Sequence, residues 1–308
     1  MKTTAKHGSA KRLNLARRET RAGWLMASPW ILGFCFFMLT PVLVSLWTSF
    51  MKYSLLSKPK YTGLANYIKL LNDPLVAKSL GITLYYTALS VPLTIVLGFF
   101  LALLLNRKIR GQFIFRTIYY LPSILNGVAI GLLWRQVFNP DFGILNYVLN
   151  LVLPVGKVEW LNDPTLVIPS LVMVTLWGVG RTMVVNLAGL QSIPSVLYES
   201  AEIDGCPVWR RIWHITVPMM TPILFLNLIT GFIGAFRTFT NAYVMTNGGP
   251  NNASLVYMLY LYQSAFQNFR MGYASALSWL LLIIVTAVTF LLFRTSRYWV
   301  YSEGGDIF

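Results

Sequence analysis

Acidic residues are scarce in this sequence: 10 Asp and Glu stand against 25 Lys and Arg in 308 residues, and the formal net charge is +15. Charged residues make up only 11% of the chain, whereas hydrophobic residues make up 56%. This balance excludes an ordinary soluble domain and indicates a membrane protein. The basic residues stand in short blocks beside long apolar runs, so they predict loops that flank membrane helices rather than a surface for nucleic acid.

Cysteine and histidine are also rare. The two cysteines, Cys35 in an apolar run and Cys206 in a polar stretch, provide no disulfide framework. His7 and His214 are the only histidines, which argues against a structural metal site. The first apolar run, 24–50, is too long for a cleavable signal and lacks a small-residue cleavage site, so we expect it to remain as the first membrane span.

Sequence motifs for ATP binding and for hydrolysis are absent. The one Gly-Lys pair, Gly156-Lys157, lacks the first glycine and the hydroxyl residue of a phosphate-binding loop. Neither His-Glu-x-x-His nor Gly-x-Ser-x-Gly occurs, so a membrane enzyme would have no recognisable metal site or nucleophile. We therefore expect this chain to carry no catalytic residues, no cofactor and no metal.

All the acidic residues fall outside the long apolar runs. Ion-coupled carriers often place a carboxylate near the membrane midplane, where it binds a proton or a sodium ion. The lack of such a carboxylate argues against a self-contained secondary transporter. Sodium sites built from carbonyl and hydroxyl oxygens keep that alternative open, as does a membrane scaffold without transport activity.

Six apolar runs each approach the ~20 residues that cross the hydrocarbon core of a bilayer. We predict an all-α membrane protein in which one domain, 24–293, contains six transmembrane helices. A basic cytoplasmic tail at 1–23 precedes this domain, and a short cytoplasmic tail at 294–308 follows it. The predicted spans lie near 24–50, 80–105, 117–138, 166–188, 217–239 and 275–293.

The distribution of Lys and Arg predicts the orientation. Fifteen of them lie in 1–23, 106–116, 188–216 and 294–308, against seven in the loops on the opposite side. This excess places both termini and the loop at 188–216 in the cytoplasm. Five lysines in 51–79 run against the pattern, but the tail and the 106–116 block outweigh them.

One polar stretch, 193–218, predicts two short helices around a glycine. Ser195 suits the first turn of a helix, Gly205 suits the left-handed position that ends one, and Pro207 can open the second. The stretch also holds three of the ten acidic residues, Glu199, Glu202 and Asp204.

The same stretch resembles the EAA loop, which marks the membrane subunits of binding-protein-dependent ABC importers. Ser200 and Val217 depart conservatively from the Ala and Leu that are usual in that loop. The resemblance implies a cytoplasmic loop that docks into a cleft of an ATPase subunit, with its acids facing basic residues. The alternative is an ordinary amphipathic connector. The residues that we assign to ATPase coupling on this resemblance are Glu199, Ser200, Ala201, Asp204, Gly205, Ile215 and Pro218.

Other segments resemble carbohydrate-uptake ABC permeases over nearly the whole chain after the basic tail. They are 50–67, 105–111, 134–146, 188–194, 243–250 and 272–276. The resemblance implies a type I ABC importer permease fold in a bacterial cell membrane. It also implies a second homologous permease, two ATPase subunits that bind ATP and Mg, an extracellular solute-binding protein, and a sugar or oligosaccharide as substrate. An importer of another solute, such as a glycerol phosphate, is the alternative within this class.

Two arginines lie deep in the predicted spans. Arg181 and Arg237 would be costly if they faced lipid, so they predict a translocation cavity. Gln or Lys is more usual in the resembling family at Arg237, and an acid at Thr240; these departures favour an acidic, uronate-containing saccharide. The alternative is that both arginines pair with backbone carbonyls or with the second permease. The candidate substrate pathway consists of Arg181, Asn186, Asn227, Arg237 and Asn241.

Overall fold

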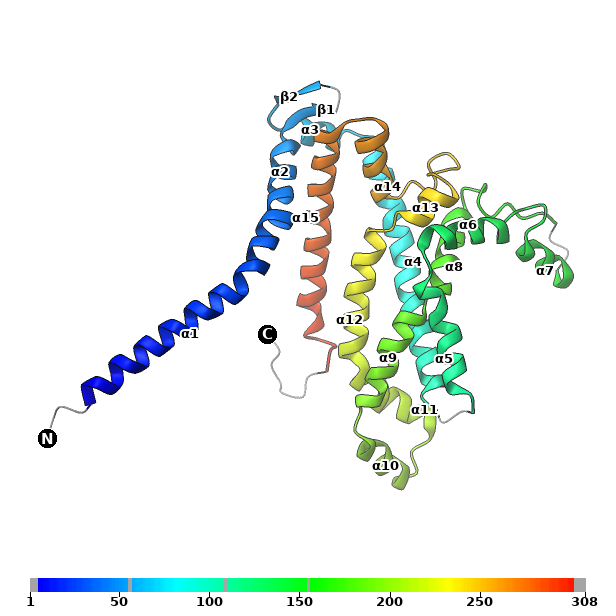
Figure 1. Cartoon of the computed structure of the whole chain (residues 1–308). Helices are drawn as coiled ribbons and strands as arrows, with labels where there is room; N and C mark the ends of the chain where they lie inside the picture. Colours follow the sequence, from blue (N-terminus) through cyan, green and yellow to red (C-terminus); the bar gives the residue numbers. More distant parts are fainter. Residues whose placement is uncertain (1–4, 55–56, 108–109, 154–155, 302–308) are drawn as a thin grey trace.

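The computed structural model describes residues 5–54, 57–107, 110–153 and 156–301. The chain is mostly helical, as predicted, and its long helices run side by side with short elements gathered at both ends of the bundle (Figure 1). The α-helices are α1 (Ala5–Phe34), α2 (Thr40–Ser49), α3 (Ala65–Leu71), α4 (Pro74–Leu105), α5 (Gln112–Tyr120), α6 (Gly127–Val137), α7 (Ile144–Val152), α8 (Val167–Trp177), α9 (Gly180–Ser192), α10 (Ser195–Ile203), α11 (Val208–Arg211), α12 (Val217–Phe236), α13 (Thr240–Met245), α14 (Tyr257–Tyr262) and α15 (Met271–Ser296).

Shorter elements join these helices. Three π-helical turns and one 3₁₀ turn connect consecutive helices: η1 (Cys35–Leu39), η2 (Leu121–Ile124, the 3₁₀ turn), η3 (Ile212–Thr216) and η4 (Gln263–Gln267). Two antiparallel strands, β1 (Met51–Ser54) and β2 (Ser57–Tyr61), form a hairpin after α2. The sequence prediction was all-α, so this hairpin is a correction to it, although a small one.

Four helical stretches of the described chain are long and apolar enough to cross a membrane: Arg18–Ser49, Pro74–Leu105, Val208–Met245 and Met271–Ser296. They contain most of four predicted spans, those at 24–50, 80–105, 217–239 and 275–293. The boundary predicted between the basic tail and the first span falls inside α1. Residues 1–4 and 302–308 of the two predicted tails lie outside the described residues.

The other two predicted spans, 117–138 and 166–188, are not single helices. The segments Gln112–Ile124 and Gly127–Val137 meet at 101°, and α8 and α9 meet at 49°. Pro122 lies in the first break, and Asn126 there adopts an extended conformation and caps α6 by accepting a hydrogen bond from the N–H of Val128. The described chain therefore has four candidate spans, or six if each bent pair is counted as one.

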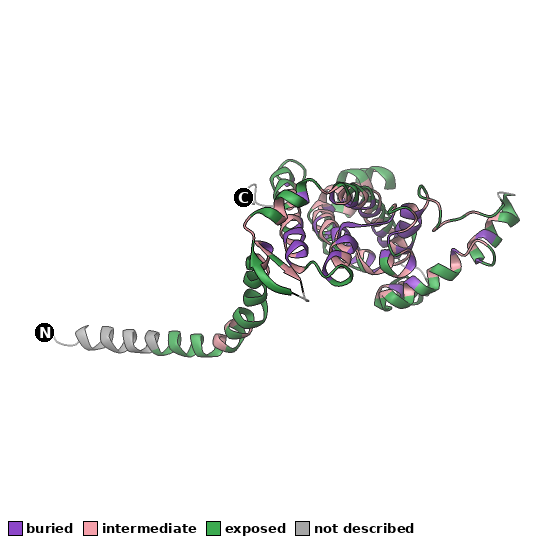
Figure 2. Ribbon diagram, turned by 90° about the horizontal axis from the view of Figure 1, so that it is seen from above, coloured by how far each residue is buried: buried purple, intermediate pink, exposed green. Residues whose placement is uncertain are grey.

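The buried core lies inside the bundle, and α1 stands apart from it (Figure 2). One hydrophobic cluster joins α4, α8, α14 and α15; a second joins α4, α9 and the start of α12. None of the most apolar part of Arg18–Ser49 is buried, although α2 packs beside α15. The apolar surface of residues 18–34 is consequently not buried by any other described part of the chain.

Candidate functional site

The α10–α11 elbow projects from the end of the bundle opposite the β hairpin (Figure 1). Gly205 adopts φ +68°, the left-handed conformation that lets the chain leave α10. Its N–H donates to the carbonyl of Glu202, and the N–H of Cys206 donates to the carbonyl of Ala201. These two hydrogen bonds form a Schellman motif, so the local prediction of two helices around Gly205 is confirmed.

The three acids of this elbow have different surroundings. Glu202 forms an ion pair with Arg211 at 3.3 Å, which joins α10 to α11 across the glycine turn. The carboxylates of Glu199 and Asp204 are exposed and have no hydrogen bond or ion pair with any described residue. Glu199 and Asp204 are therefore the carboxylates of the elbow that are available to another protein.

The remaining residues assigned to coupling divide into two groups. Ser200 and Gly205 are exposed with the two free acids, whereas Ala201, Ile215 and Pro218 are half-buried. The hydroxyl groups of Tyr198 and Thr216 are 3.0 Å apart, which connects α10 to η3 and so to the start of α12. Sequence reasoning missed this connection because Tyr198 and Thr216 lie in different predicted helices.

Large apolar side chains are exposed in the same part of the chain as the free acids. Ile203 is 87% exposed, Trp209 72% and Trp213 64%. Such exposure of large hydrophobic groups beside polar ones is typical of a surface that another protein covers. The segment from α10 to η3 thus presents two free carboxylates together with exposed large apolar side chains.

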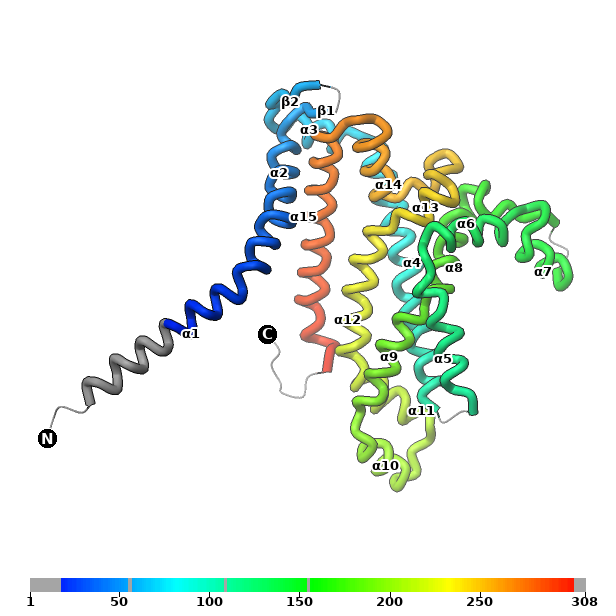
Figure 3. Tube along the Cα trace, in the orientation of Figure 1, coloured from blue at the N-terminus to red at the C-terminus, as the bar shows by residue number. Residues whose placement is uncertain are grey.

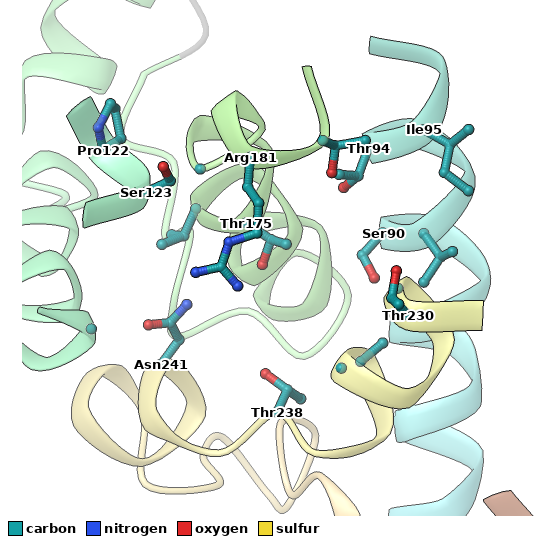
Figure 4. Close-up of a pocket in the computed structure, with 18 of the residues that line it drawn as sticks. Ser90, Thr94, Ile95, Pro122, Ser123, Thr175, Arg181, Thr230, Thr238 and Asn241 are labelled. Atoms are coloured by element: carbon teal, nitrogen blue, oxygen red, sulfur yellow. The ribbon is translucent and has the colours of Figure 1, made fainter. Parts of the chain in front are cut away.

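A cavity of about 470 Å³ is lined by residues of α4, α6, α8, α9, α12 and α13. Its size is within the range of small-ligand sites, roughly 300–1,000 Å³. Hydroxyl groups from several helices face into it (Figure 4). Its polar lining comprises Tyr86, Ser90, Thr94, Ser123, Thr175, Arg181, Thr182, Asn227, Thr230, Thr238 and Asn241.

Arg181, in the first turn of α9, is the one charged residue in this lining. Its guanidinium points into the space between Thr175, Ser123 and Asn241 (Figure 4). It has no hydrogen bond or ion pair with any described residue, so its five N–H donors are free to bind a ligand. The cavity is therefore suited to polar ligands that carry hydrogen-bond acceptors.

The structure brings together four of the five residues of the predicted substrate pathway. Arg181, Asn227 and Asn241 line the cavity, and Asn186 lies directly behind Asn227, which donates a hydrogen bond to it at 2.7 Å. Arg237, which ends α12, is exposed and is not among the lining residues. Its predicted role in the pathway stays a prediction.

Sequence reasoning missed the hydroxyl groups of the cavity. Several of these Ser and Thr side chains donate to the carbonyl three or four residues earlier, as Thr175 does to Leu171 and Thr230 to Leu226. Such back-bonding is common in membrane helices, so it carries no sequence signal for a binding site. Only the juxtaposition of α4, α8 and α12 reveals the cavity.

Comparison with known protein families identifies the family of this chain. Residues 94–301, which include the elbow and most of the cavity, match the family model described as "Binding-protein-dependent transport system inner membrane component". The chain belongs to this family. The resemblance to the permeases of binding-protein-dependent ABC importers is thereby confirmed, and the chain is a multi-pass membrane component.

Several permeases are similar to this chain along nearly their whole length. The probable ABC transporter permease protein YesP of Bacillus subtilis (strain 168) is 41% identical, and the match covers 96% of this chain and 97% of the relative. The lactose transport system permease protein LacF of Rhizobium radiobacter is 33% identical over 94% and 98% of the two chains. The trehalose/maltose transport system permease protein MalF of Thermococcus litoralis is 31% identical over 92% and 96%.

A solved structure shares the fold of this permease. A chain from the crystal structure of a bacterial ABC transporter involved in the import of the acidic polysaccharide alginate aligns with a TM-score of 0.82. The match covers 93% of this chain and 98% of that chain at 23% sequence identity. At this identity the similarity establishes the fold, and the predicted ABC permease architecture is confirmed at that level.

Proposed function

We propose that this chain is a transmembrane permease subunit of an ATP-driven ABC importer, through which a sugar or oligosaccharide crosses the bacterial cell membrane. The α10–α11 elbow carries the proposal. It projects from one end of the bundle, ends α10 with a Schellman motif and leaves Glu199 and Asp204 exposed and unpaired among the described residues. A partner with basic residues around a cleft would complement this surface.

We infer the partners from the resemblance to the same family. The complex contains this chain, a second homologous permease, two ATPase subunits that bind ATP and Mg, and an external solute-binding protein. The end of the bundle that carries α10 faces the cytoplasm, together with both termini, because most Lys and Arg of the loops lie on this side. The six spans include the two bent pairs, each of which crosses the membrane once.

Motion at the elbow reaches the cavity through α12. ATP binding closes the ATPase dimer and draws α10 with it. The contact between Tyr198 and Thr216 couples α10 to η3, and η3 continues without a break into α12. Because α12 contributes Asn227 and Thr230 to the cavity, its displacement alters access to the substrate.

The cavity and the relatives support a saccharide as substrate. The names of the relatives specify lactose and trehalose/maltose systems, and hydroxyl and amide groups are the hydrogen-bonding groups that a sugar requires. Arg181 adds an unpaired positive charge, and no carboxylate of the described chain lines the cavity. This combination favours an acidic, uronate-containing oligosaccharide, since a guanidinium can bind a carboxylate with two hydrogen bonds.

Charge reversal in the elbow tests the proposed function. In proteoliposomes that contain the complete importer, Glu199→Arg and Gly205→Leu should abolish both oligosaccharide uptake and ATP hydrolysis stimulated by the binding protein. Glu159→Arg, which reverses an exposed acid outside the elbow, should leave both near wild type. Membrane insertion of all three variants is checked by their yield in purified membranes. Wild-type uptake by the two elbow variants would refute the proposed coupling.

A further inference from the structure

Two arginines end α15 without a partner. Arg294 lies in the last turn and Arg297 follows the helix, so the two are three residues apart and face the same side. Both are exposed, and neither has a hydrogen bond or ion pair with any described residue. They lie toward the end of the bundle that carries α10 (Figure 3). Positive charge at a helix C-terminus is favourable because it interacts with the helix dipole. The helix dipole does not account for the hollow that the two arginines border.

The two arginines border a hollow of about 790 Å³, whose other lining residues are Phe290, Phe293 and Tyr298. The segment that follows α15 packs against α12. The ring of Phe225 on α12 packs edge-on against Phe293 at 5.3 Å and against Trp299 at 5.6 Å. The N–H of Tyr301 donates to the hydroxyl of Thr221 at 2.8 Å. The hollow is therefore held in place by contacts between α12 and the segment that follows α15.

An apolar groove of about 460 Å³ continues from this hollow along α15. Phe290 lines both, so they are adjacent. The groove is formed by Trp279, Leu282, Ile283, Thr286, Ala287 and Phe290. From Leu282 to Arg294 the helix rises about 18 Å, at ~1.5 Å per residue, which is comparable to one leaflet of a ~30 Å hydrocarbon core.

Nothing in the described part of this chain covers the groove. Helix α2 packs beside α15 near the hairpin end, but α1 leaves the bundle below that contact (Figures 1 and 3). The exposed fractions of Leu282, Ile283 and Phe290 are 50%, 60% and 64%. The lower half of α15 thus presents an apolar groove that leads to a pair of free guanidinium groups.

We propose that this surface binds an anionic phospholipid, with its phosphate at Arg294 and Arg297 and an acyl chain in the groove. Guanidinium groups bind phosphate oxygens with paired hydrogen bonds, and basic residues beside membrane helices attract anionic lipids. A zwitterionic lipid brings its own positive charge to the same place and is disfavoured. The phenol of Tyr298, 90% exposed at the helix end, suits the headgroup region.

A lipid competition experiment tests the headgroup. The complete importer is reconstituted into nanodiscs with equal amounts of phosphatidylglycerol and phosphatidylcholine, transferred to detergent, and the retained lipids are counted by mass spectrometry. The wild type should retain phosphatidylglycerol several-fold over phosphatidylcholine, and Arg294→Gln with Arg297→Gln should remove that preference. Arg270→Gln, at the opposite end of α15, is the control and should keep it. Equal retention of both lipids by the wild type, or an unchanged preference in the double variant, would overturn the proposal.

A second arm tests the groove without changing charge. Ala287→Phe should fill the groove and reduce retained phosphatidylglycerol to the level of the double arginine variant, whereas Ala287→Ser should behave as the wild type. Unchanged lipid retention in Ala287→Phe would overturn the assignment of the acyl chain. Release of the second permease from the purified complex by Ala287→Phe would instead identify this face as a subunit interface, which also overturns the lipid site.

Discussion

Asn227 on α12 donates a hydrogen bond from Nδ2 to Oδ1 of Asn186 on α9, at 2.7 Å. Asn186 is completely buried, and its own Nδ2 has no partner among the described residues. Asn227 is also largely buried but lines the cavity. The pair therefore joins two helices at the wall of the cavity, with one amide that can reach cavity water and one that cannot.

This asymmetry predicts unequal effects of two similar substitutions. Asn227→Leu leaves the amide of Asn186 buried without any hydrogen bond, at a cost of about 1–3 kcal/mol. Asn186→Leu leaves the amide of Asn227 facing the cavity, where water can satisfy it, so the loss should be smaller. Reversible unfolding of each variant in mixed micelles measures the difference. Equal losses, or a larger loss for Asn186→Leu, would contradict this account.

The position of Arg181 predicts its effect on substrate selection. Hydrogen bonds to charged groups contribute about 1.5–3 kcal/mol, so Arg181→Gln should raise the KM for a uronate-containing oligosaccharide roughly 10- to 150-fold. The KM for a neutral oligosaccharide of the same length should change little. Arg237→Gln should have the smaller effect, because Arg237 does not line the cavity. Uptake kinetics with both substrates provide the measurement, and equal effects on the two substrates would argue against an acidic saccharide.

A close approach between α4 and α9 predicts a matched pair of variants. A methyl group on Gly98 would lie 2.9 Å from Cγ2 of Thr182. Gly98→Ala should therefore lower the unfolding free energy by about 1–3 kcal/mol through overpacking. Because Ser lacks this Cγ2, Thr182→Ser should restore much of the loss in the double variant.

A control for this pair lies on the same helix. Gly81 on α4 has no neighbouring atom within 4 Å of the added methyl group. Gly81→Ala should leave stability unchanged or raise it by about 0.5–1 kcal/mol. Thermal unfolding of Gly98→Ala, Thr182→Ser, the double variant and Gly81→Ala distinguishes steric crowding at Gly98 from a general effect of alanine in α4. Failure of Thr182→Ser to rescue Gly98→Ala would place the crowding elsewhere.

Features with a local cause could be predicted from the sequence. The two helices around Gly205 follow from a proline, a glycine and their spacing, and the turn between them is closed by backbone hydrogen bonds between residues close in sequence. The long helices follow from continuous apolar runs of sufficient length. The family resemblance also depends on residues at fixed short spacing, so it needed no tertiary information.

Features that depend on distant segments could not be predicted. The close approach of α9 to the end of α5 depends on Gly180, where a Cβ would collide with the backbone of Tyr119 and Tyr120. Arg181 and Arg237 have similar sequence surroundings, yet only Arg181 lines the cavity. Arg181 lies in the first turn of α9, after a bend, whereas Arg237 directly follows the last residue of α12. The sequence shows both arginines but not the direction in which each points.

A cluster of hydrogen bonds between residues far apart in sequence lies at the hairpin end of the bundle. Asp73 caps α4 and accepts hydrogen bonds from the N–H of Leu75 at 3.0 Å, from the hydroxyl of Tyr273 at 2.6 Å and from the hydroxyl of Tyr260. Tyr260 belongs to α14 and Tyr273 to α15, so one carboxylate joins three helices. Nζ of Lys69 lies 5.4 Å from the centre of the Tyr273 ring.

These contacts change the acidity of Asp73. Partial burial raises its pKa, but the hydrogen bonds from Tyr260, Tyr273 and Leu75 and the positive charge of Lys69 outweigh that effect. The pKa of Asp73 therefore lies below its ordinary value of 3.8. A carboxyl group whose pKa is lowered on folding stabilises the folded state above its unfolded pKa, and this contribution is lost as the pH falls through the folded value.

Tyr273→Phe should therefore destabilise the protein at neutral pH. It should also reduce the loss of stability that occurs when Asp73 is protonated at low pH. We expect a loss of about 1 kcal/mol near neutral pH, because solvent partly screens the carboxylate and reduces the strength of the hydrogen bond. The difference from wild type should persist down to about pH 4 and shrink as the pH falls further, below 3.8 and through the folded pKa of Asp73, since the carboxyl then becomes protonated in both proteins. Thermal unfolding across this range measures it, with Tyr85→Phe, an exposed phenol without a hydrogen-bond partner in the described chain, as the control. A difference that stays constant down to the lowest pH would show that Tyr273 contributes through packing alone and not through the charge of Asp73.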